Sequence, residues 1–286
     1  PDDLYNSRRR EMSEKSIAFE YCDNLVEEFE HVIESPKVGE TSTYYTGVDL
    51  GTACIVLAVL DENYKPVAGA YRYADVVRDG MVVDYLGAVR IVRELKKEIE
   101  EKINAELIYA AAAIPPGTDA LDSGAIKNVV QAAGFELTNL LDEPTAANEV
   151  LKIQNGAVVD IGGGTTGISI LKDGKVVHVV DEPTGGTHFS LVISGAYGMP
   201  FAKADEFKRD NNNHTELLPV LKPVIEKVAS IINQHVKGYD VDGISLVGGT
   251  CCLTGIEDVI QKQTGIYTHK PKNPMFVTPL GIALSC

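Results

Sequence analysis

The chain is short of positive charge. Among its 286 residues, 26 Lys and Arg stand against 41 Asp and Glu, and the formal net charge is −15. A surface of this sign repels polynucleotides and anionic lipid headgroups, which excludes a general nucleic-acid-binding or membrane-surface protein. We expect the run Arg8-Arg9-Arg10 to be an ordinary solvated charge run rather than a nucleic-acid site. Any site for an anion must therefore be locally electropositive.

Cysteine and long apolar runs are also scarce. The 5 cysteines are odd in number and show no C-x-x-C spacing, which argues against a disulfide framework or a zinc site and predicts reduced thiols. No apolar run reaches the roughly 18 residues of a membrane-spanning helix, and the polar first residues do not resemble a secretory signal. The length and the 44% hydrophobic content can fill about two domains. We expect a cytoplasmic protein.

The most informative feature is a duplicated pattern. Gly47-Val48-Asp49-Leu50-Gly51-Thr52 in the first half matches Val159-Asp160-Ile161-Gly162-Gly163-Gly164-Thr165-Thr166 in the second. In each copy a carboxylate follows apolar residues, glycines permit a tight reversal, and Thr lies just past the bend. Glycine lets backbone N–H groups approach phosphate oxygens, and Asp can hold a hydrated Mg²⁺. One copy alone would predict an ordinary hairpin turn, whereas two copies predict a phosphate site.

The segments that follow the two copies also match. Apolar runs at 55–60 and 168–171 each lead through a polar turn to a return run, at about 67 and at 176–180. Both halves therefore predict strand, turn, strand, turn, strand. Helical spacing follows in each half, at Leu86, Val89, Val92, Leu95 and Ile99, and at Val220, Val224, Val228, Ile231 and Ile232. These patterns predict a duplicated α/β fold.

Two further segments carry glycine or carboxylate signals. The turn Leu246-Val247-Gly248-Gly249-Thr250 leaves a flat backbone surface where an adenine or ribose could lie. Between the halves, Glu143 stands just before Pro144, at a predicted helix start. Without other information this segment would be no more than a helix cap.

In this order, the segments resemble the motifs of the actin, Hsp70 and sugar-kinase superfamily of ATP-binding proteins. The resemblance implies a duplicated actin-like, ribonuclease H-like fold with minimal accessory subdomains: a helix and linker over 1–43, then lobes over 44–156 and 157–286, with hinge helices after Leu141 and Thr278. It implies that Asp49 and Asp160 hold Mg²⁺ through water, that Thr52 lies near the γ-phosphate and that Glu143 orients the attacking water. It also implies a set of residues that bind the ATP or ADP: Gly51, Thr52, Gly162, Gly163, Gly164, Thr165, Thr166, Gly185, Gly186, Asp205, Lys208, Gly248, Gly249 and Thr250.

A closer resemblance covers residues 74–80, 114–119 and 160–167. These segments are similar to a chaperonin-like family of bacterial ethanolamine utilisation, which is encoded with the enzymes and shell proteins of a microcompartment. The resemblance implies a chaperone-like or reactivating role in the cytoplasm, with a possible place at the microcompartment. The partners that it implies are a nucleotide and either ethanolamine ammonia-lyase or a shell protein.

Two departures from Hsp70 bear on turnover. Ala53 stands where Hsp70 has a second Thr, and Gly167 where it has a second Asp. Because both changes remove oxygen ligands, we expect Mg-nucleotide binding with slow hydrolysis, at most a weak ATPase. The alternatives are a small-molecule kinase, for which only Asp79 or Asp84 could act as the base, and a filament-forming actin homologue.

The first 43 residues contain an amphipathic pattern. Apolar residues recur at helical spacing, at Ala18, Cys22, Leu25, Phe29 and Val32. Pro36 and small polar residues then predict a linker. Two interpretations stay open: the helix packs on its own domain, or it docks on a client or shell protein.

Overall fold

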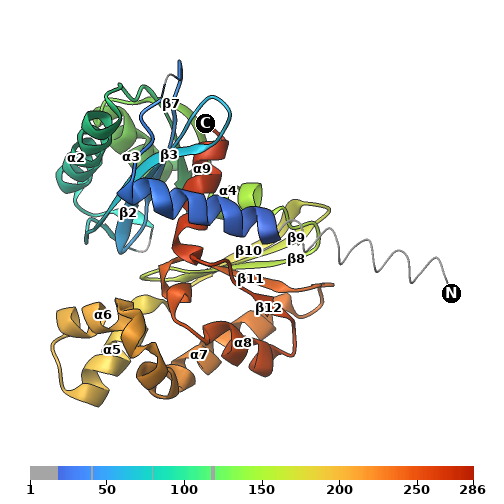
Figure 1. Cartoon of the computed structure of the whole chain (residues 1–286). Helices are drawn as coiled ribbons and strands as arrows, with labels where there is room; N and C mark the ends of the chain where they lie inside the picture. The colour runs from blue at the N-terminus through green and yellow to red at the C-terminus, as the bar shows by residue number, and fades with distance from the viewer. Residues whose placement is uncertain (1–18, 40, 79, 117–119) are drawn as a thin grey trace.

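The computed structural model describes residues 19–39, 41–78, 80–116 and 120–286. Two lobes, each built on a five-stranded sheet, flank a pair of central helices (Figure 1). This arrangement confirms the predicted duplicated actin-like fold.

The first sheet has the strand order β3-β2-β1-β6-β7. β1, β2 and β3 pair antiparallel, and β6 and β7 continue the sheet in parallel with β1. The strands are β1 (Tyr45–Leu50), β2 (Cys54–Leu60), β3 (Pro66–Tyr73), β6 (Tyr109–Ile114) and β7 (Glu136–Asp142). The small hairpin β4 (Val77–Arg78) and β5 (Met81–Val82) and the helices α2 (Tyr85–Ile103) and α3 (Ala120–Ala132) complete this lobe.

The second sheet repeats this topology in the order β10-β9-β8-β11-β12. Again three strands are antiparallel and two follow in parallel. The strands are β8 (Gly156–Ile161), β9 (Thr166–Lys172), β10 (Lys175–Glu182), β11 (Ile244–Val247) and β12 (Thr268–His269). The helices of this lobe are α5 (Gly186–Tyr197), α6 (Phe201–Arg209), η1 (Asn211–Asn213), α7 (His214–Val236), η2 (Gly249–Cys252) and α8 (Ile256–Thr264).

Both long helices form where the apolar spacing predicts them, but the buried faces differ in detail. Leu86, in the first turn of α2, is 77% exposed, and the core face begins only at Ala88 and Val89. In α7 the buried line runs through Leu217, Leu221 and Ile225. Val220 and Val224 lie beside that line and are half-buried, so the predicted stripe was rotated slightly from the true one.

Two central helices cross between the lobes. α4 (Glu143–Leu151) and α9 (Val277–Leu284), which follows η3 (Pro274–Phe276), are the predicted hinge helices. Gly281 allows them to touch, because a Cβ there would lie 1.7 Å from the carbonyl oxygen of Ala146. Gly47 similarly lets α9 rest on β1, with the Pro279 oxygen 2.3 Å from where a Cβ would be. The two central helices therefore contact each other backbone to backbone.

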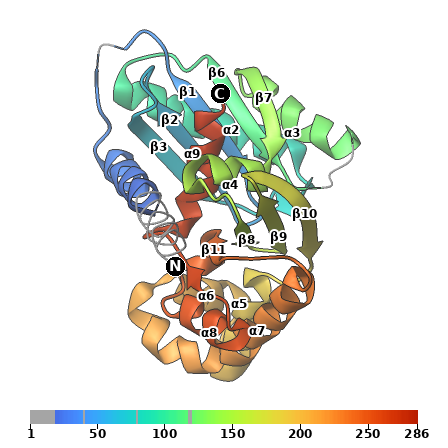
Figure 2. The same cartoon turned by 90° about the vertical axis from the view of Figure 1, so that its right-hand side faces the viewer.

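The amphipathic N-terminal segment forms a helix over residues 19–34 that lies across both lobes (Figures 1 and 2). Cys22, Val26 and Phe29 are completely buried. Phe29 packs against Gly69 of the first lobe and makes an edge contact with Phe276, at 5.2 Å between ring centroids. The described part of the helix thus packs on its own protein, which favours the first of the two interpretations; Ala18 lies outside the described residues.

Polar contacts hold the other face of this N-terminal helix. The backbone N–H of Lys272 donates to Asp23, and the Lys272 ammonium pairs with Glu27 at 2.7 Å. Asn273 donates to Glu30 at 2.6 Å. A hydrogen bond also holds the start of the linker on the first lobe: the N–H of Lys37 donates to the carbonyl oxygen of Val67. Within the described ranges, no helix combines the length and apolarity that crossing a membrane requires.

Candidate functional site

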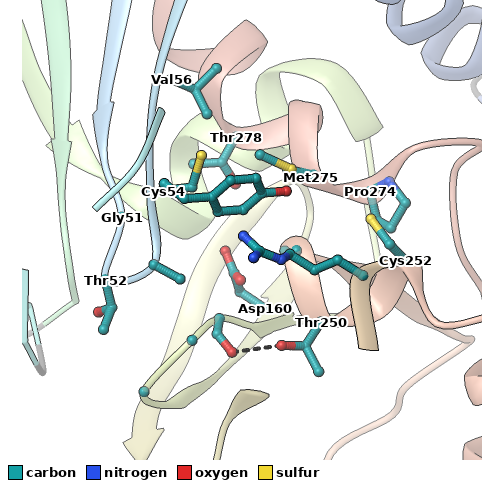
Figure 3. A pocket seen from close by; sticks show the side chains of 18 of the residues that line it. Gly51, Thr52, Cys54, Val56, Asp160, Thr250, Cys252, Pro274, Met275 and Thr278 are labelled. Carbon is teal, nitrogen blue, oxygen red and sulfur yellow. Dashed lines mark hydrogen bonds between the residues drawn. The ribbon is translucent and has the colours of Figure 1, made fainter. Parts of the chain in front are cut away.

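An open cleft of about 1420 Å³ lies between the lobes. Small-molecule pockets are usually about 300–1,000 Å³, so the cleft has room for a ligand of nucleotide size. Gly51 and Thr52 line one wall and Thr250 lines the opposite wall, with Asp160 between them (Figure 3). The two halves of the duplicated pattern therefore meet across one cavity.

The two glycine turns touch each other. A Cβ on Gly163 would lie 2.9 Å from the Cβ of Ala53, which is closer than real Cβ atoms come. The second turn is closed by a hydrogen bond from the N–H of Gly162 to the carbonyl oxygen of Thr165, at 3.0 Å. Only glycine at 163 and a small residue at 53 permit this approach.

The glycines at the start of α5 pack on the second turn. A Cβ on Gly185 would lie 2.6 Å from the carbonyl carbon of Gly164. The N–H groups of Gly186 and Thr187 donate to the carbonyl oxygens of Gly162 and Gly163, respectively. Gly185 and Gly186 therefore lie behind the second turn and support it, and the surface of the cleft next to them comes from Thr187.

The third glycine turn closes the other side. Gly248 has φ +91°, and a Cβ there would lie 2.2 Å from a carboxylate oxygen of Asp160. The Thr250 hydroxyl donates to the carbonyl oxygen of Gly162 at 2.9 Å (Figure 3). Gly248, Gly249 and Thr250 all line the cleft, so the three glycine turns form one connected surface.

Carboxylates gather at the base of the cleft. Asp49 and Asp160 are the next-to-last residues of β1 and β8, and Glu143 begins α4, where Asp142 caps the helix. All three are half-buried, because the cleft leaves one side open although protein atoms surround the rest. Burial, and after it the negative charge of Asp160, raise the pKa of Asp49 to about 7. Burial, and after it the negative charge of Asp181, raise the pKa of Asp160 to about 6.

The pKa of Glu143 is raised as well. Burial, with Asp160 and Asp49 next, raises its pKa well above the ordinary value. A group of acids that repel one another's charge is costly in the free protein. It becomes favourable when a cation with its water shell neutralises it.

Asp205 and Lys208 lie together as their spacing on α6 predicts. The Lys208 ammonium donates to Asp205 and to the Ser190 hydroxyl, both at 2.8 Å, and to the carbonyl oxygen of Gly186 at 3.0 Å. Burial lowers the pKa of Lys208. For Asp205 burial acts to raise the pKa, but Lys208 and Ser190 outweigh it and the pKa is lowered. Both side chains line the cleft.

Two residues that the sequence analysis proposed for the site, Thr166 and Asp84, do not line the cleft. The Thr166 side chain is buried away from the cleft, and its hydroxyl donates to the carbonyl oxygen of Thr184. Asp84 caps α2, accepting from the N–H of Gly87 at 2.9 Å, and is absent from the cleft lining. Asp79 lies outside the described residues. A kinase base is therefore not found among the described candidates.

The cleft is also lined by residues that the sequence interpretation missed, among them Tyr73, Asp181, Arg209 and Thr278. Each comes from an element whose position was predicted, but its side chain reaches the cleft only through strand pairing or helix packing. Arg209 directly follows Lys208, which was the one available signal. For Asp181, near the end of β10, the sequence offered no such signal.

Comparison with family models gives two partial matches. Residues 136–273 match the type IV pilus assembly protein PilM, and residues 68–195 match the MreB/Mbl protein. The crystal structure of MreB 5 of Spiroplasma citri bound to AMPPNP is 18% identical, with a TM-score of 0.69 over 85% of this chain and 96% of that one. At this identity the likeness shows the fold alone.

Closer relatives cover most of the chain. A chaperone protein HscA homolog of Rickettsia africae is 28% identical over 61% of this chain and 35% of its own. The ethanolamine utilization protein EutJ of Salmonella typhimurium is 43% identical over 88% of both chains. The crystal structure of EutJ from Carboxydothermus hydrogenoformans is 47% identical, with a TM-score of 0.89 over 93% of this chain and 98% of that one. The chain belongs to the EutJ family of ethanolamine utilization proteins.

Proposed function

We propose that the cleft binds Mg-ATP and Mg-ADP. The observation that carries this proposal is the meeting of two glycine turns, with Asp49 and Asp160, at one cavity whose third side is Gly248 to Thr250. The crystal structures of MreB 5 of Spiroplasma citri, which shares the fold, bound to AMPPNP and to ADP support it. The glycine turns could offer backbone N–H groups to the phosphates, and Asp205 and Lys208, which line the same cleft, would contact the nucleoside.

The carboxylates fit a metal held through water. Among the described residues, no three His, Cys, Asp or Glu side chains are placed to bind a metal ion directly. Mg²⁺ usually keeps several waters and takes its remaining ligands from carboxylates and phosphates. Asp49 and Asp160 would therefore hold the ion's water shell, and the ion would neutralise the phosphate charge when bound.

Hydrolysis should be slow. Glu143 is the residue that would orient water, but burial, together with the charges of Asp160 and Asp49, raises its pKa well above the ordinary value and so favours its protonated form. Ala53 and Gly167 supply no oxygen at two positions around the ion. We infer a protein that changes shape with the bound nucleotide and turns over slowly.

We further propose a chaperone-like or reactivating role in ethanolamine catabolism. The family membership supports the pathway, and the likeness to HscA supports the chaperone class. Closure of the lobes can act on a partner only if the partner binds the two states with different affinity. A tenfold bias corresponds to about 1.4 kcal/mol. Ethanolamine ammonia-lyase and a microcompartment shell protein are the candidate partners, in the cytoplasm.

Calorimetry tests nucleotide binding. The protein is titrated with ADP and ATP in Mg²⁺ and in EDTA, beside Asp160→Asn and the control Asp173→Asn, which removes the same charge at the β9–β10 turn. We expect binding by the parent and the control and a loss of at least tenfold in Asp160→Asn. Absence of binding by the parent would contradict the proposal.

A second experiment tests the partner. Immobilised ethanolamine ammonia-lyase, and separately a shell protein, is exposed to the chain with ATP, with ADP and without nucleotide. We expect the affinity for one of the two partners to differ at least tenfold between nucleotide states. Equal affinity in all states would overturn the proposed coupling.

A further inference from the structure

One place at the base of the cleft has no side chain. Gly167 lies in β9 directly opposite Asp160 of β8. It lines the main cleft and also a small cavity behind it, which Glu143, Asp160 and Ser169 border. The position is therefore central among the acids, yet it contributes no oxygen.

The neighbouring strand supplies a carboxylate there. Asp181 of β10 is the direct pairing partner of Gly167. A Cβ on Gly167 would lie 3.9 Å from Oδ1 of Asp181 and 3.9 Å from the Cβ of Asp160. The Asp181 carboxylate thus lies beside the space into which a side chain at 167 would extend.

Asp181 lies on the same face of the sheet as Asp160. Gly167 is the direct pairing partner of both residues, and directly opposed residues of antiparallel strands point to the same side. Asp181 itself is exposed and lines the cleft, so ions and water can reach it. The group therefore has four carboxylates, Asp49, Glu143, Asp160 and Asp181.

Two hydroxyls beside these acids point independently to a bound species. Thr278 is 5% exposed, and its hydroxyl lies close enough to Asp160 to act against the increase of that residue's pKa. Even so, Oγ1 of Thr278 has no partner with hydrogen-bond geometry among the described residues, nor does Oγ of Ser169, which is 1% exposed and borders the small cavity. Buried hydroxyls without partners usually mark sites of ordered water or a ligand.

We propose that Asp181 is a further carboxylate of the Mg–water site and takes the place in space of the side chain that Gly167 lacks. This inference rests on the proposed binding of Mg-nucleotide. Asp181 would act through metal-bound water, as a positioning residue, because the described acids are not placed to contact one ion directly. The carboxylate at this place thus comes from Asp181 of β10 and not from position 167 of β9.

The test compares nucleotide binding with and without metal. ADP affinity is measured by calorimetry in Mg²⁺ and in EDTA, and Mn²⁺ binding in the presence of ADP is followed by electron paramagnetic resonance. For Asp181→Asn we expect the affinity for Mn²⁺ to fall about 10- to 100-fold, the range seen when groups that orient metal ligands are removed. ADP affinity in EDTA should stay the same or rise, since a negative charge has gone. Asp173→Asn, with the same change of net charge, should behave as the parent.

A second variant distinguishes position from general damage. Gly167 does not have a positive φ, and a Cβ there makes only ordinary contacts, so Gly167→Asp fits the backbone. Added to Asp181→Asn, it should restore most of the Mn²⁺ affinity. Parent-like metal dependence in Asp181→Asn would overturn the inference while leaving the proposed function intact. If the parent bound no nucleotide, the proposed function itself would fail.

Discussion

The guanidinium of Arg209 lies 3.9 Å from the ring centroid of Tyr73. Arg209 ends α6 in the second lobe and Tyr73 ends β3 in the first, and both line the cleft. Arg209 is also paired with Asp205 of its own helix at 3.6 Å. The cation–π contact therefore joins the two lobes across the cavity and must separate when the lobes open.

Tyr73→Leu should accelerate nucleotide entry. A cation–π contact at an exposed site is worth about 0.5–1 kcal/mol, and Tyr73 is 47% exposed. We expect the association rate of a fluorescent ADP analogue to rise about two- to fivefold, measured by stopped flow. Tyr73→Phe keeps the ring and should match the parent. An unchanged rate in Tyr73→Leu would show that the contact does not limit opening.

The raised pKa of Asp49 predicts how stability depends on pH. Its value of about 7 in the folded protein lies above the ordinary 3.8. The folded state therefore holds the proton more tightly than the unfolded chain, and Asp49 lowers the free energy of unfolding as pH rises from about 4 through 7. In EDTA without nucleotide, Asp49→Asn should be more stable than the parent at pH 8, by about 2 kcal/mol. This is about half of the full shift at 1.36 kcal/mol per pKa unit, since the cleft partly solvates the group.

Urea unfolding at pH 4.5 and pH 8 checks this expectation. The difference between variant and parent should shrink to about a quarter at pH 4.5, where Asp49 is protonated in the folded state and only partly protonated in the unfolded chain. Comparing the two proteins cancels the contributions of other titrating groups. A stability difference that does not change with pH would be inconsistent with a raised pKa.

Gly281→Ala should disrupt the hinge. The Ala methyl would have to occupy a point 1.7 Å from the carbonyl oxygen of Ala146, so α4 and α9 must separate. Overpacking of this kind costs about 1–3 kcal/mol, occasionally more. The melting temperature should fall clearly. Gly195→Ala in α5 is the matched control, because nothing lies within 4 Å of its Cβ position, and should stabilise by up to about 1 kcal/mol.

Phe29→Ala should weaken the whole protein rather than the N-terminal helix alone. Phe29 is fully buried between the lobes, against Gly69 and Phe276. Removing a buried Phe costs about 3–5 kcal/mol. We expect a lower urea midpoint in a single transition. Tyr21→Ala, at a 42% exposed position of the same helix, should stay within about 0.5 kcal/mol; a helix that melts separately would contradict the packing described.

Much of the fold could be predicted because it depends on local patterns. The glycine turns, the strand triplets and the start of α4 at Glu143 are each encoded by a few adjacent residues. The duplication then predicted two similar lobes. The choice for the N-terminal helix could not be made in this way, because an apolar stripe shows that a helix is buried but does not show against what.

The candidate site was less predictable where it depends on tertiary contacts. Asp181 reaches Gly167 through the pairing of β9 with β10, and Tyr73 meets Arg209 only because the lobes face each other. Thr166, by contrast, shares the motif but alternates to the opposite face of its strand, as every second residue does. The period of two was visible in the sequence, but the direction of the cleft was not.

The contacts of the N-terminal helix also have a consequence during synthesis. Residues 19–34 are synthesised before their partners Lys272, Asn273 and Phe276, which lie 243 to 249 residues further along the sequence. The nascent helix must therefore keep Phe29 and Cys22 without their final cover while both lobes are translated. Such pairing between segments far apart in the sequence slows folding and exposes apolar surface to aggregation. The helix over residues 19–34 reaches its native contacts only when residues 272–276 have been made.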